Sequence, residues 1–227
     1  MKLASLNDGS KDGQLIVVSR DLSKFAYASD VSQTMQNAMD NWEDVFNELT
    51  GLSNDLNRGN LKSKKFEPKN VLSPLPRSYQ WADGSAYVNH VHLVRKARGA
   101  DMPDSFWNDP LMYQGGSDDF IPPLSPIYLP DESWGIDMEG EIAVITGKVN
   151  MGTSSKKALS SIRLLMLVND VSLRNLIPNE LSKGFGFFQS KPSTAFSPVA
   201  VTPDELDNIW RDGKVHQVLE VDLNGEP

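Results

Sequence analysis

The 227-residue sequence contains no cysteine, which excludes disulfide bonds, thiolate metal ligands and a cysteine nucleophile. It has only three histidines, His90, His92 and His216, so a bound metal would be held mainly by oxygen rather than by imidazole. No apolar run approaches the ~20 residues that span a bilayer, and the N-terminus turns polar too soon for a secretory signal. We therefore expect a cytoplasmic protein without a membrane partner.

Basic residues are fewer than acidic ones. The chain has 22 Lys and Arg against 30 Asp and Glu, which gives a formal net charge of −8. Proteins that bind nucleic acids or anionic membranes usually carry the opposite sign, so neither is an expected partner. The 39% hydrophobic content is typical of a globular protein, and the length allows one large domain or two small ones.

The N-terminal residues predict a β-hairpin followed by a helix. Residues 3–6 and 15–19 have strand character, and the segment between them is rich in Asn, Asp and Gly. Apolar residues then recur at helical spacing over about 32–49, with Gly51 as a stop signal and a short second helix over 53–57.

A proline-rich stretch over 66–77 is the best linker candidate, because its three prolines require an extended path. We place a domain boundary near residue 70. The predicted domains are a small N-terminal α+β domain over 1–70 and a larger β-rich domain over 71–227. Loops are expected to dominate from 79 to 130, where six further prolines exclude long helices.

The segment 138–146 predicts a strand that begins with two carboxylates and becomes apolar. Side chains alternate along a strand, so Glu139 and Glu141 face the same side. Both faces are apolar further along, which predicts burial on both sides. Two carboxylates at the end of a buried strand repel each other and lose hydration, and a divalent cation would relieve both effects. The alternative is a solvent-exposed strand end without a metal.

The C-terminal third predicts further strands. The apolar run 164–168 indicates a buried strand, a short helix is expected over 172–176, and 196–201 and 218–223 indicate two more strands. The final strand precedes Asn-Gly, a strong hairpin signal, yet only two residues follow. We therefore expect the chain to be cut in the middle of a hairpin.

Other polar residues outside the 138–146 strand are candidates for chemistry, each with an ordinary structural alternative. Asp83 could be a turn residue, His90 a core histidine and Tyr113 a packing aromatic. Asp170 could cap a helix, and Lys191 could be a solvated lysine. Their combined order along the chain favours a common site.

The segments that contain these residues, taken in their order along the chain, resemble the fumarylacetoacetate hydrolase family. The resemblance covers roughly residues 70 to 225 and indicates, more narrowly, the fumarylacetoacetase-like hydrolases of that family. The resemblance implies that two glutamates of a Glu-x-Glu strand and two separate aspartates hold Mg²⁺ or Ca²⁺, with Mn²⁺ also acceptable. The matching positions are Asp83, Glu139, Glu141 and Asp170.

The resemblance also assigns the remaining site residues. His90, seven residues after the first aspartate, would be the general base for water, and Lys191 would stabilise the developing enolate together with the metal. Tyr113 and Arg174 would position the substrate. Ser85 stands where a second pocket tyrosine is expected, and we assign it to the substrate pocket.

Two further departures leave the substrate open. Ile177 replaces an expected glutamine, and Arg98 stands one place from an expected arginine. A glutamate that orients the family's histidine and a Gly-Thr segment that binds the substrate carboxylate belong to a C-terminal region beyond this chain.

The implied fold is α+β, mainly β: a small N-terminal domain followed by a mixed β-sandwich roll, usually as a homodimer. The implied reaction is metal-dependent hydrolysis of a carbon–carbon bond in a 1,3-dicarbonyl acid. Fumarylacetoacetate, cleaved to fumarate and acetoacetate in aromatic amino-acid catabolism, is the leading substrate. The alternatives are a 2-oxo acid decarboxylase or dienoate hydratase of the same superfamily, or a truncated metal-binding member without turnover.

Overall fold

A computed structural model gives the fold of residues 1–85, 87–97 and 99–226, so Arg98, which the sequence analysis singles out, lies outside the described residues.

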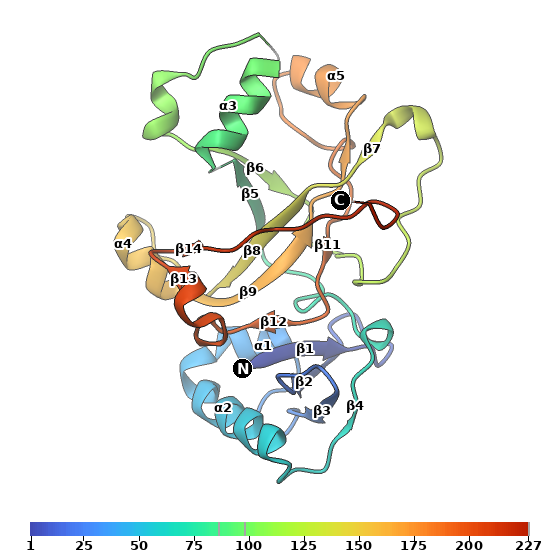
Figure 1. The fold of residues 1–227 in the computed structure, drawn as a ribbon, viewed down its shortest axis with the longest axis vertical. Coiled ribbons are helices and arrows are strands. Elements are labelled where there is room, and N and C mark those ends of the chain that lie inside the picture. Colours follow the sequence, from blue (N-terminus) through green and yellow to red (C-terminus); the bar gives the residue numbers. More distant parts are fainter. Residues whose placement is uncertain (86, 98, 227) are drawn as a thin grey trace.

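 The N-terminal segment forms the lower part of the molecule in Figure 1, and the remaining chain forms the upper part. The fold is mixed α+β and mainly β, as predicted, and the named strands pair in antiparallel fashion. Within the described residues, no helix combines the length and apolar character that crossing a lipid bilayer requires.

The predicted N-terminal hairpin is confirmed. Strand β1 (Lys2–Leu6) pairs with β2 (Gln14–Val18), and β3 (Lys24–Tyr27) and β4 (Lys64–Lys65) extend the sheet. Gly13 closes the hairpin with φ +63°, where an added Cβ would lie 2.7 Å from a backbone oxygen. Only glycine fits both the backbone angle and the space at this position.

The helical region differs from the prediction. Helix α1 (Met35–Asp40) is followed by a longer α2 (Trp42–Arg58), which ends at Gly59 in the left-handed conformation rather than at Gly51. Gly51 lies inside α2. A glycine inside a helix costs only about 1 kcal/mol relative to alanine. Burial of the apolar face of α2 on both sides of Gly51 outweighs this cost.

One sheet joins the N-terminal and C-terminal segments. Its strand order is β11-β9-β12-β1-β2-β3-β4, and β8 pairs with β9 off this path. The strands from the C-terminal segment are β8 (Gly140–Thr146), β9 (Ile162–Asn169), β11 (Ala195–Phe196) and β12 (Ala200–Val201). The two segments on either side of residue 70 therefore share one sheet. The division of the chain into two domains at this residue stays a prediction.

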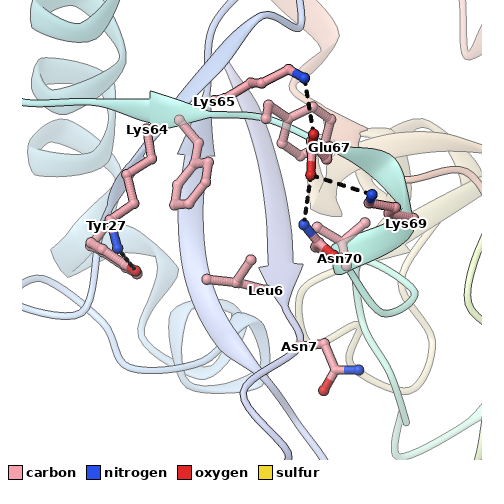
Figure 2. A pocket seen from close by; sticks show the side chains of 11 residues that line it. Leu6, Asn7, Tyr27, Lys64, Lys65, Glu67, Lys69 and Asn70 are labelled. Carbon is pink, nitrogen blue, oxygen red and sulfur yellow. Dashed lines mark hydrogen bonds and ion pairs between the residues drawn. The ribbon is translucent and has the colours of Figure 1, made fainter.

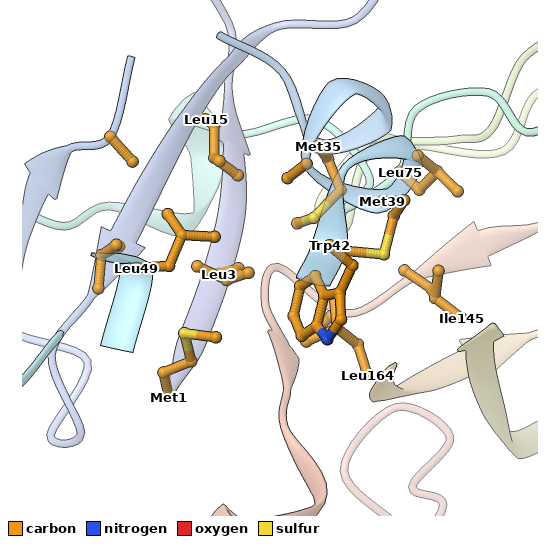
Figure 3. Close-up of a cluster of buried hydrophobic side chains, with 14 of the residues drawn as sticks. Met1, Leu3, Leu15, Met35, Met39, Trp42, Leu49, Leu75, Ile145 and Leu164 are labelled. Atoms are coloured by element: carbon orange, nitrogen blue, oxygen red, sulfur yellow. The ribbon is translucent and has the colours of Figure 1, made fainter. Parts of the chain in front are cut away.

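The main hydrophobic core is also shared between the two segments. Figure 3 shows Leu3 and Trp42 from the N-terminal segment in one cluster with Ile145 and Leu164 from β8 and β9. Leu3 and Leu164 are both fully buried. The burial of apolar surface is the main driving force of folding, so each segment stabilises the other.

Strand β8 is buried on one face, and the prediction that both faces are buried is wrong. Ala143 and Ile145 are buried, whereas Val144 on the opposite face is 40% exposed. The exposed face is apolar, so composition alone could not distinguish it from a core-facing surface. Glu141 lies on the same strand face as Ala143 and Ile145.

The loop prediction for 79–130 is wrong in its first half. Strand β5 (Trp81–Ser85) pairs with β6 (Leu111–Gly115), and helix α3 (Val88–Ala97) and the short η2 (Asp104–Trp107) lie between them in the chain. The prolines of this region begin at Pro103, so they do not interrupt α3. Proline limits a helix only where it falls inside it.

The helix predicted over 172–176 is wrong. Residues Ser172–Leu173 form the short strand β10, which pairs with β7 (Ile136–Asp137). The helix α5 (Ile177–Ser182) begins only at Ile177. Pro178 lies in the first turn of α5, where its missing N–H has no helical partner to lose. Proline thus begins this helix instead of ending it.

The strand predicted over 218–223 is absent, although the Asn-Gly turn after it forms. Asn224 and Gly225 have φ of 55° and 83°, and an isolated bridge joins Leu223 to Glu226. This extended segment crosses β8 in Figure 1, with Val221 close to Gly140. The remaining short elements are η1 (Pro68–Asn70), η3 (Glu132–Trp134), α4 (Ser155–Ala158), η4 (Leu159–Ser161), η5 (Pro203–Ile209), β13 (Trp210–Arg211) and β14 (Lys214–Val215).

Two leucines of β9 test the shared core. We expect Leu164→Ala to lower the free energy of unfolding by about 2–5 kcal/mol, because it opens a cavity between the two segments. Leu167→Ala, on the same strand but 51% exposed, serves as the matched control and should cost less than about 1 kcal/mol. Urea denaturation followed by tryptophan fluorescence measures both. Equal losses would contradict the shared core.

Candidate active site

Two strand ends bring the acidic residues together. Glu139 directly precedes β8, Glu141 lies within it, and Asp170 directly follows β9. The pairing of Gly140 with Asn169 places these ends side by side, and the Asp170 N–H donates to the Glu139 carbonyl at 3.0 Å. Glu139 and Glu141 are far from Asp170 in the sequence and meet it because β8 and β9 are antiparallel neighbours.

Asp83 reaches the same place from the separate β5–β6 sheet. In this sheet Asp83 lies directly opposite Tyr113. Trp81, at the start of β5, packs edge-on against Phe196 of β11, with ring centroids 5.4 Å apart. This aromatic contact holds the small sheet against the large one and so places Asp83 beside the ends of β8 and β9.

Three of the four predicted metal ligands form a compact group. Asp83, Glu139 and Glu141 each offer a carboxylate oxygen, and these atoms all lie within 4.8 Å of one another. All three residues are partly buried. Oxygen donors at this spacing suit a hard divalent cation such as Mg²⁺, Mn²⁺ or Ca²⁺.

The pKa values show that the group is crowded with negative charge. Burial, followed by the charges of Asp83, Asp170 and Glu139, raises the pKa of Glu141 to about 7. Burial and the neighbouring Asp170 also raise the pKa of Asp83. A bound cation would offset both the repulsion and the lost hydration, so these residues fit a metal.

Asp170 is fully buried and is held by three donors. The Lys191 ammonium donates to it at 2.7 Å, the Thr194 hydroxyl at 3.0 Å, and the Tyr113 hydroxyl also donates to it. The structure thus brings Asp170 next to the three-carboxylate group, but with its oxygens already hydrogen-bonded. Its role as a fourth metal ligand stays a prediction. Its alternative role as a helix cap is wrong, because β10 follows it.

Lys191 links the two acidic parts of the site. Its side chain is only 7% exposed, and it donates to Glu139 at 2.6 Å as well as to Asp170. Burial alone would lower the pKa of Lys191, but the hydrogen bonds to Asp170 and Glu139 raise it. The ammonium therefore stays charged, and the solvated-lysine alternative is wrong.

Tyr113 forms one wall of the site. Burial and the hydrogen bond to Asp170 raise the pKa of its hydroxyl well above the usual value, so it stays protonated. Its ring lies 5.2 Å from the Lys191 nitrogen and packs edge-on against Phe187 at 5.1 Å. Cation–π and edge-to-face contacts of this kind hold the lysine and both rings in place.

Arg174 lies at the rim of the site. Its guanidinium pairs with Asp137 at 2.7 Å and with Glu139. Burial alone would lower the pKa of Arg174, whereas its hydrogen bond to Asp137 and the charge of Glu139 raise it. The side chain is 44% exposed, so it is accessible to a substrate carboxylate.

His90 and Ser85 are less closely tied to this network. Ser85 is the last residue of β5 and is partly buried. His90 lies in the first turn of α3 and is exposed, so the core-histidine alternative is wrong. Across the described residues, no hydrogen bond or ion pair joins the His90 side chain to the carboxylate group. Its catalytic role stays a prediction.

Sequence reasoning missed Thr194, Phe187 and Asp137. Each contacts a predicted site residue: Thr194 donates to Asp170, Phe187 packs on Tyr113, and Asp137 pairs with Arg174. None stands in a motif that the sequence distinguishes from ordinary loop residues. Only their position after folding marks them.

A hollow in the N-terminal segment is lined by residues of β1 and β3 and by residues between 64 and 71. It has a volume of about 420 Å³. Its cations are already paired: Figure 2 shows Lys65 with Glu67 at 2.9 Å and Lys64 with the Tyr27 hydroxyl at 2.7 Å. None of the predicted site residues lines it, so it is separate from the carboxylate group.

The raised pKa of Glu141 predicts a pH dependence for cation binding. In the metal-free protein the folded state keeps a proton on Glu141 up to about pH 7, whereas the unfolded value is 4.5. The free energy of unfolding of the metal-free chain should therefore fall as pH rises through this window, and stabilisation by Mn²⁺ should grow over it.

Thermal melting with and without Mn²⁺, at about pH 5 and about pH 8, measures this effect. The Mn²⁺-induced rise in melting temperature should be larger at the higher pH and should be lost in Glu141→Gln. The exposed Glu132→Gln is the matched control and should keep it. A rise that is equal at both pH values would contradict a site made of these carboxylates.

Solved structures share the fold. A fumarylacetoacetate hydrolase from Exiguobacterium antarcticum superposes with a TM-score of 0.64 and 16% identity, covering 96% of this chain and 74% of that one. A maleylpyruvate hydrolase from Sphingobium sp. SYK-6, solved in complex with manganese(II) ion and pyruvate, superposes with a TM-score of 0.59 and 15% identity, covering 90% and 68%.

Curated relatives match over shorter stretches. A 2,4-didehydro-3-deoxy-L-rhamnonate hydrolase from Sphingomonas sp. is 33% identical over 101 residues, which are 43% of this chain and 34% of that protein. The mitochondrial oxaloacetate tautomerase FAHD1 from Bos taurus is 26% identical over 138 residues, 58% and 59% respectively. The matches thus span less than two thirds of these relatives.

Two family models together cover nearly the whole chain. The model described as fumarylacetoacetase N-terminal domain 2 matches residues 1–77, and the model described as fumarylacetoacetate (FAA) hydrolase C-terminal matches residues 80–227. The second match alone includes every predicted site residue. On this evidence the chain belongs to the fumarylacetoacetate hydrolase family.

Proposed function

We propose that this chain carries the active site of a divalent-cation-dependent hydrolase that cleaves a carbon–carbon bond of a 1,3-dicarbonyl acid. The observation that carries the proposal is the three-carboxylate group next to the buried Lys191–Asp170–Tyr113 network. Fumarylacetoacetate is the leading substrate from the sequence. The name of the maleylpyruvate hydrolase widens the candidates to acylpyruvates.

The metal would be held by Asp83, Glu139 and Glu141, with Asp170 as the fourth candidate ligand. When bound, a divalent cation would supply Lewis acidity towards a chelated dicarbonyl acid. Mg²⁺, Ca²⁺ and Mn²⁺ all suit an all-oxygen donor set. The carboxylates of the chain therefore bind the ion, and the neighbouring cations and hydroxyl act on the substrate.

Hydrolysis adds water oxygen to one carbonyl carbon, breaks the bond to the adjacent carbon and leaves its electron pair on the enolate of the departing acid. The Lys191 ammonium is charged and nearly excluded from solvent, and in this proposal it stabilises the negative enolate oxygen. Tyr113, which keeps its proton, can donate a hydrogen bond to the same region. The enolate then takes up a proton to give the product.

Substrate recognition falls to Arg174 and Ser85. Arg174 is accessible at the rim, and a guanidinium binds a carboxylate through two parallel hydrogen bonds. To bind substrate it would exchange part of its pairing with Asp137 and Glu139. Ser85 offers a hydroxyl at the end of β5, two residues after Asp83.

His90 is the proposed general base for the attacking water. It follows Asp83 by seven residues and lies in the first turn of α3, a helix that contacts β5. Catalytic hydrogen bonds are often long in the absence of substrate and shorten in the complex.

The homodimer implied by the resemblance also remains a proposal, which sedimentation equilibrium would test.

A second candidate is proton transfer or decarboxylation on a 2-oxo acid. Two observations favour it: His90 stands apart from the carboxylate network, and one relative is named an oxaloacetate tautomerase. Such a reaction needs the metal and Lys191 but no base for water. A chain that binds metal without turnover is the remaining alternative.

Replacement of His90 separates the two reactions. We expect His90→Ala to lower kcat/KM for hydrolysis of acylpyruvates and fumarylacetoacetate by roughly 100-fold or more, because a general base contributes about that much. His92→Ala, exposed on the same helix, is the matched control and should stay within about twofold. A loss below about tenfold would overturn the assignment. Unchanged oxaloacetate tautomerisation in the same variant would favour the second candidate.

Replacement of Lys191 tests enolate stabilisation in either reaction. We expect Lys191→Met to lower kcat by roughly 100- to 1,000-fold, which is the usual cost of one electrostatic donor. Lys183→Met, an exposed lysine after α5, is the control. Steady-state kinetics on the Mn²⁺-loaded protein measures both. Full activity of Lys191→Met would exclude the proposed role.

A further inference from the structure

The segment from Asp170 to Thr194 leaves β9 and returns to the same point. Its first residue, Asp170, accepts hydrogen bonds from Lys191 and Thr194 near its end. Helix α5 and a loop containing Gly184 and Gly186 lie between. Both glycines have positive φ, of +80° and +92°, and an added Cβ at either would meet open space. The loop itself therefore supplies little to hold the residues that follow.

Glu180 of α5 holds the residues that follow this loop by accepting hydrogen bonds from them. Its carboxylate accepts the backbone N–H groups of Phe188 at 3.0 Å, Gln189 at 2.7 Å and Ser190 at 3.0 Å. The Ser190 hydroxyl also donates to it. Three successive N–H groups that converge on one anion form a concave nest, and hydrogen bonds to a charged acceptor are stronger than neutral ones.

These contacts end directly before Lys191. Ser190 is fully buried, and its carbonyl accepts the Leu173 N–H of β10 at 2.8 Å. The residue before Lys191 is thus held on one side by Glu180 and on the other by β10. Phe187, which packs on Tyr113, directly precedes the residues bound by Glu180.

The Lys191 ammonium must be positioned accurately. Its ammonium contacts two carboxylates at once, at 2.6 Å and 2.7 Å, through a side chain with four rotatable bonds. Such a contact is maintained only if the backbone is fixed, and a displacement of ~1 Å at a catalytic group can lower a rate about 100-fold. Among the described residues, the Glu180 carboxylate forms its hydrogen bonds with residues 188–190 and none with the carboxylate group or with Lys191.

 The effect of Glu180 on Lys191 therefore passes through the backbone of residues 188–190.

We propose that Glu180 is a positioning residue, which fixes residues 188–190 and thereby sets Lys191 and Phe187 in the active site. The inference rests on the proposed function for its catalytic consequence. Hydrogen bonds from Ser190 and from the backbone of 188–190 outweigh the effect of burial and lower the pKa of Glu180 to about 2, so its carboxylate is charged at neutral pH.

The test compares Glu180→Gln and Glu180→Ala with Asn179→Ala in the full chain. Glutamine has the same shape but directs an amide donor at backbone donors, and alanine removes the acceptor altogether. Asn179 is the adjacent, exposed residue of α5 and is the matched control. A melting temperature and Mn²⁺ binding, measured for each variant, identify any variant that has not folded.

Two readouts follow the loop and the lysine without relying on turnover. Amide hydrogen exchange of a peptide covering 187–191 should become about tenfold faster or more in both Glu180 variants, because its protecting hydrogen bonds are lost. Acylation of Lys191 by an anhydride, mapped by mass spectrometry, should also become faster. Asn179→Ala should match the wild type in both. Unchanged exchange and labelling in folded Glu180 variants would overturn the inference.

Kinetics then tests the catalytic consequence. We expect kcat to fall by about 10- to 100-fold in the Glu180 variants, with a smaller change in KM, because Lys191 acts on charge that develops during the reaction. Faster exchange with unchanged kcat would overturn positioning for catalysis. If the wild-type protein turns over none of the dicarbonyl acids, the proposed function fails, and exchange and labelling alone decide whether Glu180 positions Lys191.

Discussion

The antiparallel pairing of β8 with β9 is the constraint on which the rest of the structure depends. One end of the pair places Glu139 and Glu141 beside Asp170, and the opposite end contributes Ile145 and Leu164 to the core shared with the N-terminal segment. The same register therefore determines both the position of the acidic residues and the stability of the fold. A shift of one residue would turn the carboxylates to the opposite face.

The site stores unfavourable electrostatic energy that the fold compensates. Four carboxylates meet there, from Asp83, Glu139, Glu141 and Asp170, and the neighbouring cations Lys191 and Arg174 neutralise only part of their charge. Burial makes the remaining charge unfavourable, and a bound hard cation would offset it. The raised pKa values of Asp83 and Glu141 and the fit of the group to a metal both follow from this crowding.

The chain between Asp170 and Thr194 forms a single structural unit. It begins with a buried aspartate, contributes Arg174 at the rim, and returns Lys191 to the aspartate. Its own hydrogen bonds to Glu180 hold it together. Short-range contacts within one segment thereby create a geometry that the two strands alone could not provide.

The sequence by itself determined the hairpin at the N-terminus, because alternation and turn residues are local properties. The family and its mainly β fold followed from the resemblance carried by the order of the polar segments. The sequence did not determine which face of β8 is buried, where the helices begin and end, or that Glu180 and Thr194 support the site. Those features depend on contacts between residues that are far apart in the chain or unmarked by any motif. Only the packed tertiary structure brings those partners together, because hydrogen bonds and burial act on distance in space and not on distance in sequence.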